Sequence, residues 1–200
     1  KRKKKKKTKK KINQFINKWI HLKINNVLKN LVDLKNIKEN NSSIKALAYQ
    51  LYENNGVLKR EQVSDYLKKL EQNERKILRE LGVKFGRYHV FLNQLIKPEA
   101  VSLRTLLWKN YHQKYHKLKP PTIGLNFLDD KEITNKNFML LCGFEKFDNY
   151  FVRIDILERL FILIINSISK EITEIKIVPE MLNLLGCSKD KFRKLLQKMN

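Results

Sequence analysis

The chain has 200 residues, 42% of them hydrophobic, and a formal net charge of +23 at neutral pH. This length and apolar content allow one substantial core or two small ones, and we expect two subdomains. No apolar run approaches the roughly 20 residues that cross a bilayer, which argues against a membrane partner. The two cysteines, Cys142 and Cys187, form no Cys-x-x-Cys pair, so we expect neither a disulfide framework nor a zinc site.

Positive charge is concentrated in the first 121 residues. Residues 1–11 carry a net charge of +10, residues 12–121 carry +12 and residues 122–200 carry +1. A basic half beside a nearly neutral half indicates a surface for a polyanion, and nucleic acid is the natural partner. The run KRKKKKKTKKK at 1–11 repels itself and buries no apolar area, so we expect a disordered tail. Direct phosphate contact and a nuclear import signal are the alternatives for this run.

Residues 12–118 are predicted to form a basic helical subdomain. Apolar residues three and four positions apart predict a long amphipathic helix from Ile12 to Leu34, whose apolar face must pack on another surface. Shorter helices are expected at 44–52, 60–70 and 73–81.

A short β element and one more helix complete this subdomain. Residues 83–92 are rich in β-prone side chains and are interrupted by Gly86, which predicts a short strand or a hairpin. Pro98 then starts a helix that runs to about His116, with a buried stripe that includes Tyr111.

Residues 119–137 lack periodicity after Lys-Pro-Pro and are predicted to be a linker. Residues 138–200 are predicted to form a small α+β, winged-helix-like subdomain. It is expected to contain strands at 138–144, 149–154 and 172–178, a helix from 155 to about 168, and a helix-turn-helix-like pair at 179–185 and 188–199. The expected fold class is therefore mainly α with short β elements.

Residues 84–119 carry the pattern that is typical of single-strand recognition. Eight Lys or Arg residues stand against Glu99 alone, with aromatic residues between them. Cations neutralise phosphates and exposed aromatic rings stack on unpaired bases. We predict four of the six aromatic residues to be core. The candidate nucleic-acid-binding residues are Lys84, Arg87, Tyr88, Lys97, Arg104, Lys109, Lys114 and Tyr115.

The sequence offers no catalytic site. It has no G-x-x-x-x-G-K-[ST] loop and no Gly-x-Ser-x-Gly elbow, so we expect no ATP hydrolysis and no acyl transfer by these residues. His112 and His116 lie four apart on a predicted helix, but the Glu of a zinc peptidase is missing and Lys114 repels a cation. We therefore expect no metal or cofactor in this stretch.

Four ordered blocks carry a resemblance to a known family. They are LGVKFGRYHVFLNQLIKPEAVSLRTLLW at 81–108, ALAYQLYENNGVLKR at 46–60, VRIDILERL at 152–160 and MLNLLGCS at 181–188. Together they resemble the region after the ATPase core in DExH-type superfamily II helicases of alphaproteobacteria, relatives of the mitochondrial degradosome RNA helicase. Asn93 stands where the family pattern has Pro.

This resemblance implies a function. Two RecA-like ATPase domains precede the region in that family, so the parent would be a cytoplasmic bacterial helicase that binds ATP and Mg²⁺ upstream of Lys1. The present residues would bind or guide single-stranded RNA or DNA beside those ATPase domains, without being an enzyme themselves. The alternatives are a free-standing DNA-binding protein that uses the C-terminal helix pair, and a scaffold that docks on protein.

Overall fold

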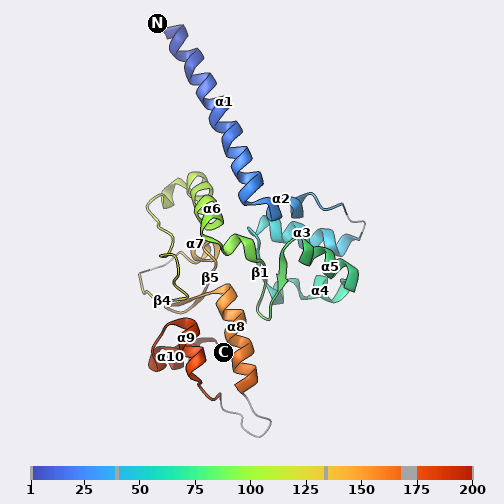
Figure 1. Cartoon of the computed structure of the whole chain (residues 1–200), viewed down its shortest axis with the longest axis vertical. Coiled ribbons are helices and arrows are strands. Elements are labelled where there is room, and N and C mark those ends of the chain that lie inside the picture. The colour runs from blue at the N-terminus through green and yellow to red at the C-terminus, as the bar shows by residue number, and fades with distance from the viewer. Residues whose placement is uncertain (1, 39–40, 133–134, 168–174, 200) are drawn as a thin grey trace.

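The computed structural model is mainly helical and contains two small antiparallel sheets, which confirms the predicted fold class (Figure 1). It describes residues 2–38, 41–132, 135–167 and 175–199. Within these ranges, the helices are all too short or too polar to span a membrane.

The first helix, α1 (Arg2–Val27), projects from the body of the molecule (Figure 1). Its first turns include residues 2–11, for which we expected disorder; lysine is a good helix former, and the helix extends through them from the apolar stretch behind. The predicted Ile12–Leu34 helix breaks at Leu28, and α2 (Lys29–Lys35) follows. We expected the apolar face of this helix to pack on another surface. Phe15 is 71% exposed and Trp19 is 55% exposed, so only the C-terminal end of α1 packs on the core.

The first module has the element order of a winged helix, namely helix, strand, two helices and two strands. Its sheet has the order β1-β3-β2, and all pairs are antiparallel. Asn41 accepts a hydrogen bond from the backbone N–H of Ser43 at the start of the first helix, and Gly82, at φ +87°, turns the chain from the last helix into β2. The elements are α3 (Ser42–Glu53), β1 (Val57–Lys59), the 3-10 helix η1 (Arg60–Val63), α4 (Ser64–Lys69), α5 (Gln72–Glu80), β2 (Val83–Phe85) and β3 (His89–Leu92).

A second module repeats this order with one helix fewer between the first two strands. Its sheet has the order β4-β6-β5, so the last strand is again central. β4 lies inside the segment that we predicted to be a linker. The elements are the 3-10 helix η2 (Asn93–Ile96), which leads in, then α6 (Pro98–Tyr111), the 3-10 helix η3 (Gln113–Tyr115), β4 (Phe127–Asp129), α7 (Lys136–Leu141), β5 (Phe144–Phe147) and β6 (Tyr150–Arg153).

The two sheets share one pairing register. Val83 pairs with Leu92 in the first sheet as Phe144 pairs with Arg153 in the second. Gly143, at φ +85°, takes the place of Gly82. The chain therefore contains an internal structural repeat.

Charge is inverted between the two repeats. Aligning the two glycines places Glu145 at the position of Lys84 and Asp148 at the position of Arg87. The inversion holds at these two positions, whereas Lys146 places a cation in the second hairpin at the position of Phe85.

Three helices close the fold: α8 (Ile154–Ser167), α9 (Pro179–Leu185) and α10 (Lys189–Met199), the last two forming the predicted helix pair. They share a core with buried Leu157, Met181 and Phe192. The predicted strand at 172–178 falls partly outside the described residues, and residues 175–178 form no strand.

The two modules pack directly on each other. Val57 and Phe91 of the first sheet and Ile154 at the start of α8 form one buried cluster. On the far side of the second module, Trp108 of α6 packs against buried Phe138. Helix α6, which we placed in the 12–118 subdomain, packs into both cores: Ala100 and Leu103 belong to the core of the first module, and Trp108 packs on the core of the second.

Candidate nucleic-acid interface

The predicted site residues separate into three places. Lys84 on β2 and Lys97 before α6 line one hollow, Arg87 and Tyr88 lie in the β2–β3 turn, and the remaining candidates lie on or after α6. Sequence proximity therefore overstated how close these side chains are to one another.

The first place is a basic groove along β2, defined here by the cations Arg79, Lys84, Lys97 and Arg159. Two adjoining hollows of about 520 Å³ and about 490 Å³ form it, and both are lined by Arg79, Lys84 and Asn93. Lys97 lines the first hollow and Arg159 the second. Helix α5, strand β2 and helix α8 thereby bring together cations that are far apart in the sequence.

The cations of the basic groove have no carboxylate partner within 4 Å among the described residues. Arg79 has its guanidinium 5.6 Å from the centre of the Phe85 ring. The two acids that line the groove are engaged elsewhere: Asp155 pairs with Arg153 at 2.7 Å, and Glu158 binds backbone N–H groups. The groove is therefore a region of uncompensated positive charge.

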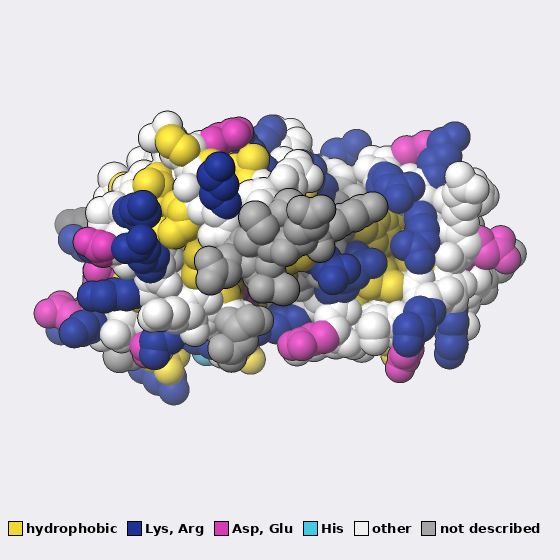
Figure 2. All heavy atoms as spheres, turned by 90° about the horizontal axis from the view of Figure 1, so that it is seen from below, with side chains coloured by type: hydrophobic (Ala, Val, Ile, Leu, Met, Phe, Trp, Pro, Cys, Tyr) yellow, Lys and Arg dark blue, Asp and Glu magenta, His cyan; other side chains and the backbone are white. Residues whose placement is uncertain are grey.

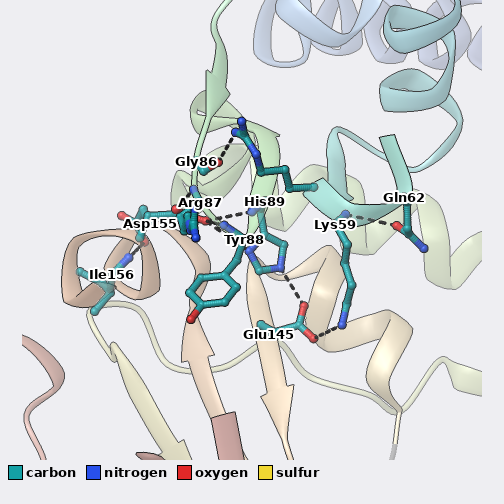
Figure 3. Close-up of polar contacts among 11 residues, drawn as sticks. Lys59, Gln62, Gly86, Arg87, Tyr88, His89, Glu145, Asp155 and Ile156 are labelled. Atoms are coloured by element: carbon teal, nitrogen blue, oxygen red, sulfur yellow. Dashed lines mark hydrogen bonds and ion pairs between the residues drawn. The ribbon is translucent and has the colours of Figure 1, made fainter. Parts of the chain in front are cut away.

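The second place is the β2–β3 turn, which Glu158 of α8 fixes in position. Its carboxylate accepts hydrogen bonds from the backbone N–H groups of Arg87, Tyr88 at 3.0 Å and His89 at 2.9 Å. Gly86 makes this approach possible, because a Cβ there would lie 2.3 Å from Glu158 Cδ. Arg60 donates to the Gly86 carbonyl at 2.7 Å (Figure 3).

A buried polar network lies below the turn and joins the two modules. His89 Nε2 lies 2.9 Å from Glu145 Oε2, and Lys59 Nζ lies 3.3 Å from Glu145 Oε1 (Figure 3). His89 Nδ1 lies 3.5 Å from Glu158 Oε1 without hydrogen-bond geometry. The imidazole thus sits between two carboxylates.

The titration of this network reflects both burial and pairing. Burial alone would lower the pKa of His89, but the hydrogen bond to Glu145 and the negative charges of Glu145 and Glu158 outweigh it, and the pKa is raised. Burial alone would raise the pKa of both carboxyls. The contacts with His89, and for Glu158 the backbone N–H groups, outweigh burial and lower both values. The network therefore favours a protonated histidine between two carboxylates.

Two of the predicted phosphate contacts are engaged inside the protein. Arg104 is buried, and its guanidinium donates to the carbonyls of Leu95 at 2.9 Å and Asn55 at 2.6 Å. Burial lowers its pKa to about 10. Lys109 is half-buried and donates to the Leu118 carbonyl at 3.2 Å. Arg104 thus ties α6 to the end of α3 and is not available to a phosphate.

The third place, at the end of α6, holds an aromatic cluster. Tyr115 stacks on Trp108 with ring centres 5.3 Å apart, and Lys114 lies 4.8 Å from the Tyr115 ring centre. Tyr115, a predicted stacking residue, therefore has one face occupied from within the chain. Tyr111, which we expected to be buried, is 85% exposed.

Sequence reasoning missed Arg79, Arg159 and Glu158. Arg79 precedes the turn at Gly82, and Arg159 lies beside Glu158 in the block VRIDILERL, well beyond the basic stretch at 84–119. No signal within one sequence shows that α8 lies against β2.

Comparisons of the chain with known protein families, with curated proteins and with solved structures found no match.

Proposed function

We propose that this chain binds single-stranded nucleic acid along the basic groove, as an accessory region of an ATP-dependent helicase. ATP and Mg²⁺ would be bound by ATPase domains of the same polypeptide, and this region would hold or guide the strand beside them. One observation carries the binding proposal: Arg79, Lys84, Lys97 and Arg159 line one groove and form no ion pair within the part of the chain that the structure describes. The helicase context comes from the resemblance of the four sequence blocks.

The chemistry of the groove suits a strand that is recognised through its backbone. Unpaired cations displace counterions from phosphates whatever the base sequence. Tyr88, which is 36% exposed at the adjoining turn, offers a ring to an unstacked base, although its edge already meets Phe161 at 5.0 Å between ring centres. Figure 2 shows that Lys and Arg side chains also cover much of the face seen from below, which supports a wider electrostatic attraction.

The alternative reader of duplex DNA, the α9–α10 pair, is less favoured by its charges. Lys191 of α10 pairs with Asp129 at 3.0 Å and Lys198 pairs with Asp148 at 3.2 Å. Arg193 lies 3.9 Å from Asp190 within the same helix. Three of the five cations of α10 therefore already have a carboxylate partner, and only Lys189 and Lys194 have no ion pair among the described residues.

The groove is tested with a variant in which both Lys84 and Lys97 are replaced by Ala. Its affinity for a labelled 12-nucleotide oligo(U) is measured by fluorescence anisotropy over a range of salt concentrations. Each exposed charge contact contributes up to about 1 kcal/mol, so we expect affinity to fall about tenfold. Loss of two contacts should flatten the salt slope by about 1.4.

Lys68→Ala with Lys69→Ala is the matched control, because it removes the same charge from α4 outside the groove. The comparison is repeated in the chain lacking residues 1–11, since the lysine-rich run binds any polyanion. Equal losses in the groove variant and the control would contradict the proposed groove. A strong preference for one duplex sequence would favour the helix pair.

A second candidate, a scaffold that docks on protein, is favoured by α1. Its residues Ile12, Phe15, Ile16 and Trp19 are exposed and follow the i, i+3, i+4, i+7 spacing of helices that bind in apolar grooves. A variant in which both Phe15 and Trp19 are replaced by Gln separates docking on protein from nucleic-acid binding by this face. Strand affinity within about twofold of the parent chain would assign this face to protein docking, whereas a loss above about fivefold would assign it to nucleic acid.

A further inference from the structure

A cleft of about 570 Å³ lies on the other side of the β2–β3 turn from the basic groove. Its lining comes from β1, η1, the start of α4, the β2–β3 turn, the start of β3, β5, α8 and α10. Gly86 lines the groove and the next residues, Arg87 and Tyr88, line the cleft. A strand that leaves the groove therefore reaches the cleft by crossing the turn.

The lining of the cleft holds two carboxylates, Glu61 and Glu145, against five Lys or Arg side chains. Lys59 and Lys198 are paired with Glu145 and Asp148. Three further cations, Arg60, Arg87 and Lys146, line the cleft without an ion pair among the described residues.

These three cations are held by other contacts that leave donors free. Arg60 uses one guanidinium nitrogen on the Gly86 carbonyl. Arg87 lies 5.4 Å from the Phe161 ring centre, and Lys146 lies 5.6 Å from the Phe151 ring centre. Contacts with a ring face orient a cation without consuming its hydrogen-bond donors. The three side chains can therefore still donate to an anion.

The floor of the cleft is buried. It contains His89 and Glu145, which are 2% and 3% exposed. Tyr88 and Phe147 add aromatic surface to the walls. Unpaired cations beside aromatic rings, in a hollow of this size, suit a nucleotide whose phosphate carries more than one negative charge.

We propose that this cleft binds a terminal phosphate monoester of a nucleic-acid strand, with Arg60, Arg87 and Lys146 as the phosphate contacts. A monoester carries nearly two negative charges and three acceptor oxygens at neutral pH, against one charge for an internal diester. Three unpaired cations therefore favour the strand end over the strand interior. This inference rests on the proposed function, because it places the end of the strand that the basic groove holds.

The experiment compares 12-nucleotide oligo(U) strands that carry a 5′-phosphate, a 3′-phosphate or hydroxyls at both ends, by competition against a labelled strand on the full chain. The phosphorylated strand of one polarity should bind about fivefold more tightly than the hydroxyl strand, and which polarity wins identifies the end. Arg87→Ala with Lys146→Ala should bring this ratio to within about twofold. Lys68→Ala with Lys69→Ala should leave the ratio unchanged.

Equal affinity of all three strands for the parent chain would overturn the inference and leave strand binding by the groove intact. Loss of affinity for every strand in the cleft variant, with the ratio unchanged, would also overturn it.

Free nucleotides test the cleft without the groove. In NMR titrations, uridine 5′-monophosphate or 3′-monophosphate should shift the amide resonances of Arg60, Tyr88 and Lys146, and uridine should not. If the monophosphates shift these resonances while no oligo(U) binds, the cleft stands and the proposed function fails. If neither monophosphate shifts them, the cleft proposal is overturned.

Discussion

Replacing Glu158 with Gln should destabilise the protein by about 2–4 kcal/mol, because this carboxylate fixes the β2–β3 turn. It accepts three backbone N–H groups, from Arg87, Tyr88 and His89. A hydrogen bond to a charged group contributes about 1.5–3 kcal/mol, and a Gln side chain loses the charge and points an NH₂ group toward donors. The side chain of Glu158 is only 13% exposed, so solvent screens these bonds weakly.

The pH dependence of this difference follows from the lowered pKa of Glu158. A group whose pKa is lower in the folded state stabilises that state above its unfolded pKa, near about 4.3. The contribution is lost as pH falls through the folded value. The difference in free energy of unfolding between the parent chain and Glu158→Gln should therefore be largest near neutral pH and should decrease below about pH 4.

Urea unfolding followed by circular dichroism measures this gap, with Glu80→Gln as the matched control. Glu80 is exposed at the end of α5, and its loss should change the free energy of unfolding by less than about 0.5 kcal/mol. If Glu158→Gln unfolds within 0.5 kcal/mol of the parent chain, the turn does not depend on this carboxylate and the reasoning is wrong.

Three further substitutions test His89, Arg104 and Gly86. The raised pKa of His89 means that its stabilising contribution is complete below about pH 6.5 and is lost as pH rises through the folded value; urea midpoints from pH 5.5 to 9 should fall in the parent chain more than in His89→Gln. Arg104→Met should cost about 2–4 kcal/mol in urea unfolding, since it leaves two carbonyls unpaired, yet the folded variant should keep its oligo(U) affinity; a loss of affinity would restore Arg104 as a phosphate contact. Gly86→Ala should cost about 1–3 kcal/mol through its clash with Glu158, and a double-mutant cycle with Glu158→Ala should show strong coupling; additive costs would exclude the clash as the cause.

Local signals in the sequence predict many of the elements, but the expected strand at 138–144 is instead mostly the helix α7, with β5 starting only at Phe144. Pro98 starts α6, Gly82 ends the turn after α5, and the alternation around Gly86 yields the β2–β3 hairpin. Each of these depends on backbone constraints or on side-chain periodicity, which are visible within a dozen residues. The end of α1 at Val27 has no comparable marker.

The site was predicted only in part, because its remaining members come from distant segments. Lys84 and Lys97, two of the predicted phosphate contacts, line the candidate groove, but Arg79 and Arg159 join them only through tertiary packing. Arg104 was selected because it lies in a basic stretch of the sequence. In the fold its guanidinium instead donates to two backbone carbonyls that need a donor. The sequence alone does not show which carbonyls will lie beside a given arginine.

The internal repeat poses a problem of strand choice during folding. Both sheets use the same register around their central strand, so β1 could in principle add to β6 instead of β3, within one chain or between two. Residues at equivalent positions discriminate against this exchange: Lys59 and Asp129 occupy the same place beside His89 and Tyr150. In the native pairing Lys59 meets the buried Glu145. Moving β1 to the second sheet would give up the Lys59–Glu145 ion pair, so this charge difference favours the native pairing of β1 with β3 over domain swapping.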